Sequence, residues 1–198
     1  MEYKYGVIST GEKSGELLVE RSRTIAATLG YPEKPADVAY GFAYDAGNLE
    51  RIYSKDETLR NSRELMETGQ PSPRMFRYRE SPRPIIPWAG AQVTVQDPVM
   101  ERPGEIRLLT DPVGRLLEFK AIPIQPQERS SETKPVKWQT LFEAAGLDMS
   151  KYEQVDPDFL PPVFADEKTK WKGPFISDPA MSVEIEAAAY NGRAVWFS

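Results

Sequence analysis

Two stretches of the chain have apolar residues at the spacing of an amphipathic helix. The first covers residues 16–29 and is followed by Gly30, and the second covers residues 138–145 and is followed by Gly146. Glycine commonly ends helices because it adopts the left-handed backbone conformation without strain. The sequence therefore predicts a helix at each place, and a third, charged and moderately amphipathic helix over about residues 45–66.

Two other segments alternate apolar and polar residues on either side of a turn signal, which is typical of a β-hairpin. In residues 105–122 the turn is Asp-Pro-Val-Gly, where proline presets its φ angle and glycine tolerates a positive one. In residues 183–197 the turn is Asn-Gly, the strongest short-range hairpin signal. We therefore expect a hairpin in the middle of the chain and another near its end.

Further strands are predicted where alternation occurs without a turn signal. Residues 38–44 and 74–79 each alternate as one strand, and residues 163–175 form either a strand pair or one long strand. In the first hairpin, Leu117 and Phe119 are expected to face the side of the sheet that a helix covers.

The order helix, strand, hairpin occurs once on each side of a segment rich in Gln, Ser, Glu and Pro. This order predicts an α+β fold of two tandem units, each a short helix packed on a curved antiparallel sheet. The expected divisions are a lead-in at 1–15, a first unit at 16–122, a linker at 123–135 and a second unit at 136–198. The chain stops inside a predicted strand, so we expect a piece of a longer protein. Duplication is a hypothesis at the level of pattern, because the two halves share little sequence.

Composition excludes several functions for the 198-residue chain. It has no cysteine and no histidine, which removes disulfides, thiolate metal sites and every nucleophile that a histidine would activate. The net charge of −5 argues against nucleic acid or an anionic membrane surface as a partner. No run approaches the roughly 20 apolar residues of a membrane span. We expect no catalytic residue, no metal and no cofactor.

The candidate binding residues are cations and one aromatic residue around the second predicted strand. Arg77 and Arg79 are expected on one face of that strand, with Phe76 and Tyr78 on the other. Arginines in a row suit carboxylates, phosphates or an acidic peptide, although a solvated face paired with nearby glutamates is the simpler interpretation. The full predicted set is Arg74, Arg77, Arg79, Arg83 and Trp88.

The chain also resembles a known family over roughly residues 16–198. The motifs that carry the resemblance are short and structural, and they include Leu29-Gly30-Tyr31-Pro32, Ser81-Pro82-Arg83-Pro84, Gly114-Arg115-Leu116-Leu117-Glu118-Phe119, Leu160-Pro161-Pro162-Val163-Phe164 and Tyr190-Asn191-Gly192-Arg193. Together they resemble the non-kinase region of large bacterial membrane-anchored serine/threonine protein kinases. The hairpins are similar, more weakly, to PepSY-like and cystatin-like modules.

The resemblance implies a non-catalytic, extracytoplasmic region that senses a ligand or contacts an envelope protein and relays this to a kinase domain elsewhere in the parent chain. Two alternatives stay open. One is a PepSY-like binding or inhibitor module that offers strand edges to its partner. The other is a carboxylate-dependent hydrolase that uses Asp166 and Glu167, near two further acids at positions 156 and 158.

Overall fold

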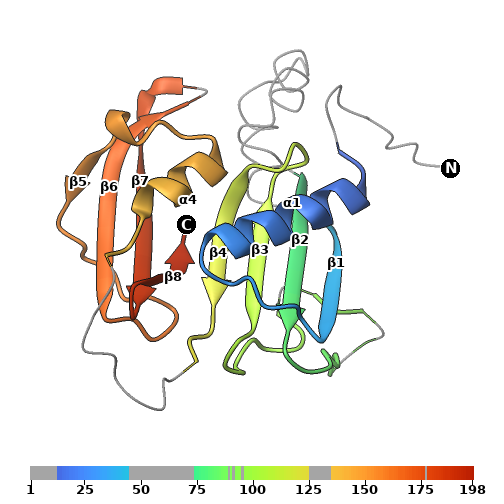
Figure 1. Ribbon diagram of the computed structural model, residues 1–198. Helices are drawn as coiled ribbons and strands as arrows, with labels where there is room; N and C mark the ends of the chain where they lie inside the picture. Colours follow the sequence, from blue (N-terminus) through green and yellow to red (C-terminus); the bar gives the residue numbers. More distant parts are fainter. Residues whose placement is uncertain are drawn as a thin grey trace, which may run out of the picture.

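The computed structural model describes residues 13–198 apart from 45–73, 89, 91, 95, 125–134 and 177. Within these residues the fold is α+β, with one antiparallel eight-stranded sheet in the order β1-β2-β3-β4-β8-β7-β6-β5. Two α-helices lie on one face of this sheet (Figure 1). The elements are α1 (Gly15–Thr28), β1 (Asp37–Tyr44), β2 (Arg74–Ser81), β3 (Ile106–Thr110), β4 (Leu116–Ala121), α4 (Trp138–Ala145), a 3-10 helix η1 (Met149–Lys151), β5 (Glu153–Val155), β6 (Glu167–Phe175), β7 (Asp178–Tyr190) and β8 (Arg193–Phe197).

Each half of the chain contributes one described α-helix and four strands to the shared sheet. The halves meet at their last strands, where β4 pairs with β8 at Phe119↔Phe197 and Lys120↔Trp196. The predicted units therefore do not each have a separate sheet. The boundary expected between them falls between β4 and α4, and most of the expected linker lies outside the described residues.

Both described helices are confirmed, α4 with the predicted bounds and α1 shifted by one residue toward the N-terminus. The hydroxyl of Ser14 accepts a hydrogen bond from the amide of Leu17 at 3.4 Å and so caps α1. Gly30 follows α1 with a φ of 99°. Gly146 ends α4 in the left-handed conformation, with a φ of 70°. The helix predicted over about residues 45–66 lies outside the described residues.

Both predicted hairpins are confirmed. Asn191 and Gly192 have φ angles of 51° and 74°, as a two-residue turn with positive φ at both positions requires. In the β3–β4 hairpin, the buried carboxylate of Asp111 accepts hydrogen bonds from the amides of Val113 at 3.0 Å and Arg115 at 2.9 Å. The side chain of Asp111 therefore stabilises the turn by accepting hydrogen bonds from its backbone amides.

One prediction in that hairpin is wrong. The register shifts within β4, so Leu109 pairs with Glu118 while Thr110 pairs with Leu116. Leu117 is the extra residue of a β-bulge, and it is Leu116 that is buried beside the core residue Phe119. Alternation alone predicts the wrong leucine because a bulge exchanges the faces of the residues beyond it.

The strand predicted within residues 163–175 is a single strand, β6, and it begins only at Glu167. Its neighbours are β5 and β7. Aromatic rings pack together in the core of the second half. Phe142 of α4 packs edge-on against Trp171 of β6 at 5.0 Å and against Phe197 of β8 at 6.3 Å between ring centroids. Most of the buried apolar residues form one cluster that extends from Leu18 to Phe197.

Candidate functional site

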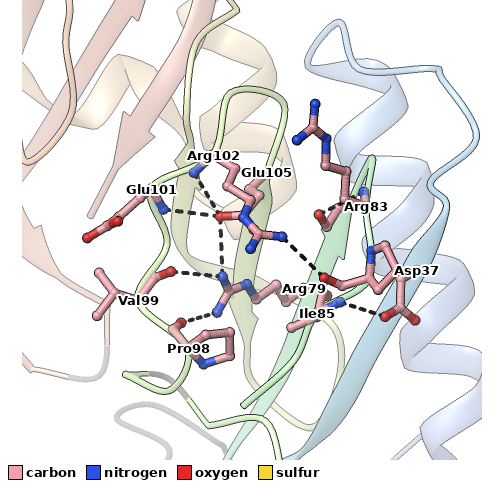
Figure 2. A network of polar contacts seen from close by, with 11 residues as sticks. Asp37, Arg79, Arg83, Ile85, Pro98, Val99, Glu101, Arg102 and Glu105 are labelled. Carbon is pink, nitrogen blue, oxygen red and sulfur yellow. Dashed lines mark hydrogen bonds and ion pairs between the residues drawn. The ribbon is translucent and has the colours of Figure 1, made fainter. Parts of the chain in front are cut away.

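Arg79, one of the predicted binding residues, is buried and holds a loop onto the sheet (Figure 2). Its guanidinium donates to the carbonyl oxygens of Pro98 at 2.5 Å and Val99 at 3.4 Å, and to the carboxylate of Glu105 at 3.3 Å. The same carboxylate oxygen accepts the amide of Glu101 at 3.1 Å. Arg79 therefore anchors the segment 98–105 to the face of the sheet opposite the helices, and both of its terminal guanidinium nitrogens already donate hydrogen bonds.

Arg83 and Trp88 lie in the first part of the connection between β2 and β3, before the segment that Arg79 holds. The guanidinium of Arg83 makes none of the contacts drawn in Figure 2, although its amide donates to the hydroxyl of Ser81 at 3.1 Å. The side chain of Trp88 is 91% exposed, while its amide donates to Asp97 at 2.6 Å. The predicted residues are thus distributed over two faces and a loop, and they do not converge on one site.

Arg74 and Arg77 lie beside β1, the strand at one end of the sheet (Figure 1). The guanidinium carbon of Arg74 lies 3.9 Å from the ring centroid of Phe42. Arg77 extends over Gly41 on the opposite face, where its Nη2 would lie 3.4 Å from a Cβ atom at that glycine. The predicted division of β2, with Arg77 and Arg79 on one face and Phe76 and Tyr78 on the other, is confirmed, whereas Arg74 lies on the face of Phe76.

Partial burial lowers the pKa of Arg77, because a charged guanidinium is less well solvated between two strands. Within the described part of the chain, this guanidinium has no ion pair and no hydrogen bond. Its charge is therefore available to an anion that approaches β1 from outside the sheet.

The edge strand β1 carries a row of aromatic side chains. Tyr40, Phe42 and Tyr44 are 53%, 37% and 65% exposed, and they share the face on which the helices lie. Tyr40 and Phe42 each lean against the buried ring of Phe76, at 6.0 Å and 5.3 Å between ring centroids. The aromatic row therefore packs against β2 on its inner side and is exposed to solvent on its outer side.

No described strand pairs with the outer side of β1. Proteins usually protect such an edge with lysines, prolines, bulges or a very short strand. The seven residues after Asp37 contain no charge and no proline, and β1 pairs with β2 along its whole length without a register shift. The opposite edge strand, β5, has only three residues. These features make β1 the edge that is best suited to accept an added strand.

Two of the acids considered for hydrolysis, Asp166 and Asp158, have structural partners. Asp166 accepts a hydrogen bond from the amide of Asn191 at 3.0 Å, which holds the β7–β8 turn. Asp158 accepts one from the ammonium of Lys170 at 2.7 Å, and this contact lowers the pKa of the carboxyl. Among the described residues, no group of three or more acidic side chains is placed to hold a metal ion.

Residue patterns alone do not identify β1 as an edge, because a strand that is central in a sheet can have the same alternation. The only available signal is the absence of lysine and proline from residues 38–44, and it acquires meaning only once the strand order is known.

No protein-family model, no curated protein and no solved structure matches this chain. In the described residues, neither α-helix has the length and apolar character that crossing a bilayer requires.

Proposed function

We propose that this chain is a non-catalytic protein-binding region that takes up an extended segment of a partner along the outer edge of β1. The observation that carries the proposal is the combination of two features of β1. No described strand pairs with its outer edge, which carries no charge after Asp37, and its aromatic row is half exposed. Strand addition derives its affinity from main-chain hydrogen bonds and its specificity from side chains on alternating positions. β1 offers both.

The two faces of β1 define the chemistry of the partner. On the face shared with the helices, Tyr40 and Phe42 favour aromatic or β-branched side chains, at about 0.2–1 kcal/mol for each cross-strand pair. On the other face, Arg77 favours a carboxylate near Gly41, and hydrogen bonds to charged groups contribute about 1.5–3 kcal/mol. The expected ligand is an extended peptide with apolar residues on one side and an acid on the other.

The resemblance to kinase-associated regions extends this proposal to the parent protein. Each half would then be a PepSY-like or cystatin-like unit, and the chain would lie on the extracytoplasmic side of a membrane-anchored serine/threonine kinase. Its partner would be an envelope protein, and occupation of β1 would be relayed to the kinase. A PepSY-like inhibitor would use the same edge to block its partner.

The test uses a synthetic eight-residue peptide with alternating valine and threonine and one central aspartate. We expect it to bind the chain and to slow hydrogen exchange of the β1 amides. Tyr40→Lys places a charge on the edge and Arg77→Gln removes the cation, so each should weaken binding, by about tenfold for Arg77→Gln. Isothermal titration gives the affinities.

Two controls accompany this experiment. Leu160→Lys adds the same charge at an exposed position far from β1 in the sequence, and should leave binding unchanged. A peptide with lysine in place of aspartate should bind the wild-type chain more weakly than the aspartate peptide does. Protection at another edge, or equal binding by Tyr40→Lys and wild type, would contradict the proposal.

A further inference from the structure

A cavity of about 430 Å³ opens where the two halves of the sheet separate. Strands β4 and β8 pair only at Phe119↔Phe197 and Lys120↔Trp196, and they diverge toward the start of β8. The residues after β4 and the β7–β8 turn therefore form opposite walls. We call this space the junction cleft, and its lining includes Lys34, Glu80, Ile106, Ile124, Arg193 and Val195.

The base of the junction cleft is apolar. Ile106 and Val195 are buried, and Pro82 and Ile124 close in from the sides. Gly104 makes this closure possible, because a Cβ at that position would lie 3.3 Å from Pro82 and 3.5 Å from Ile124. Its φ of 87° also favours glycine. The volume falls in the range of small-molecule sites, which are mostly apolar with a few polar groups that set the orientation.

The buried acid in the wall, Glu80, already has hydrogen-bond partners within the protein. Both oxygens of Glu80 accept hydrogen bonds from Arg23, at 2.9 Å and 3.0 Å, and one also accepts the hydroxyl of Tyr78 at 2.8 Å. Glu80 therefore needs no cation from a ligand, and its role is to hold α1 against the end of β2.

Two cations, Lys34 and Arg193, lie at the rim of the junction cleft. Within the described residues, Lys34 and Arg193 form no ion pair and no hydrogen bond. The stem of Arg193 rests against Gly30, and its guanidinium lies 6.0 Å from the ring centroid of Tyr31. Glu33 is the one acid of the lining besides Glu80. The rim thus holds two available cations for one exposed acid.

From this arrangement we propose that the junction cleft binds a small amphipathic anion, with its apolar body on Ile106 and Val195 and its acidic group between Lys34 and Arg193. This site is separate from the β1 edge. A ligand bound there contacts both halves of the sheet, so it stabilises the seam between β4 and β8 that few backbone pairs hold.

The test compares two probes with the same apolar chain, octanoate and the neutral octanamide, by NMR titration of the labelled protein. We expect octanoate to shift the amide signals of Gly104, Asn191 and Gly192 and to bind more tightly than octanamide. Arg193→Gln should weaken octanoate about tenfold and leave octanamide unchanged, because only the anion uses the guanidinium. Lys34→Gln should act in the same direction.

A matched pair of variants tests the location. Ile124→Glu places a carboxylate at the mouth of the cleft and should abolish octanoate binding, whereas Leu160→Glu adds the same charge at another exposed position and should not. Equal affinity for the two probes, an undiminished affinity in Arg193→Gln, or shifts confined to β1 would overturn the proposal. Binding of the β1 peptide is measured in a separate experiment. Its failure would contradict the function proposed for β1 and would leave the ligand proposed for the junction cleft unaffected.

Discussion

At the scale of single residues, Glu80 shows how burial and hydrogen bonds compete. Burial raises the pKa of its carboxyl above 4.5, and the hydrogen bonds from Tyr78 and Arg23 oppose this rise without cancelling it. The folded protein therefore binds this proton more tightly than the unfolded chain does. The stabilisation due to Glu80 is present in full below pH 4.5 and is lost as the pH rises through the raised pKa.

The raised pKa of Glu80 predicts how the substitution Glu80→Gln changes the pH dependence of stability. Glutamine does not titrate, so the free energy of unfolding of the variant should improve relative to wild type as the pH rises from about 4 to 7. Urea unfolding of both proteins at several pH values measures the difference. A difference that is constant over this range, or that changes in favour of wild type, would contradict the assignment.

Arg79 makes a second prediction at this scale. Arg79→Met leaves the carboxylate of Glu105 buried without its cation and leaves the carbonyls of Pro98 and Val99 without a donor. Breaking a buried pair in this way costs about 3–5 kcal/mol of the free energy of unfolding. The double variant Arg79→Met/Glu105→Gln should recover part of this loss, and urea unfolding measures both. Stability of the single variant equal to wild type would show that the network does not anchor the loop.

At the scale of elements, η1 and β6 pack so closely that only glycine fits at one position. A Cβ at Gly173 would lie 2.5 Å from the ring of Tyr152 and 2.9 Å from the carbonyl oxygen of Lys151. Because the second neighbour is backbone, the clash cannot be relieved by rotating a side chain. The contact therefore sets how η1 lies on β6.

We accordingly expect Gly173→Ala to lower the free energy of unfolding by about 1–3 kcal/mol, the range for overpacked cores. Gly15→Ala is the matched control, because a Cβ there meets no atom closer than 4.0 Å and alanine favours helices by up to about 1 kcal/mol. Thermal or urea unfolding distinguishes the two. The prediction fails if both variants are as stable as wild type.

At the scale of the whole molecule, one core spans both halves although few strand pairs join them. Phe197 pairs with Phe119 across the seam and with Ala187 of β7, and its ring packs against Phe142. The apolar cluster is continuous from α1 to β8. Shared packing of this kind favours a single cooperative unfolding transition.

Phe197→Ala should therefore destabilise both halves together, by about 3–5 kcal/mol. Hydrogen exchange checks this, because the amides of β3 and β7 should lose protection by the same amount. Phe164→Ala, at an exposed position before β6, should have a much smaller effect. Loss of protection in β7 alone would show that the halves are independent units.

The local features of this fold follow from sequence. Gly30 and Gly146 end helices, and Asn191 with Gly192 reverses a hairpin, because each depends on the conformations that a few neighbouring residues allow. The division of β2, with Arg77 and Arg79 on one face and Phe76 and Tyr78 on the other, follows from alternation alone. The α+β class is the sum of these local preferences.

Tertiary structure decided the rest. The bulge at Leu117, the pairing of β4 with β8 and the edge position of β1 depend on segments that are far apart in sequence. Whether Arg79 is exposed or buried depends on the loop that lies over it, and the same alternating pattern allows both. For this reason, the sequence by itself determined which elements form and which residues share a face. Only long-range packing decided which of the described cations form ion pairs and which strands lie at the edges of the sheet.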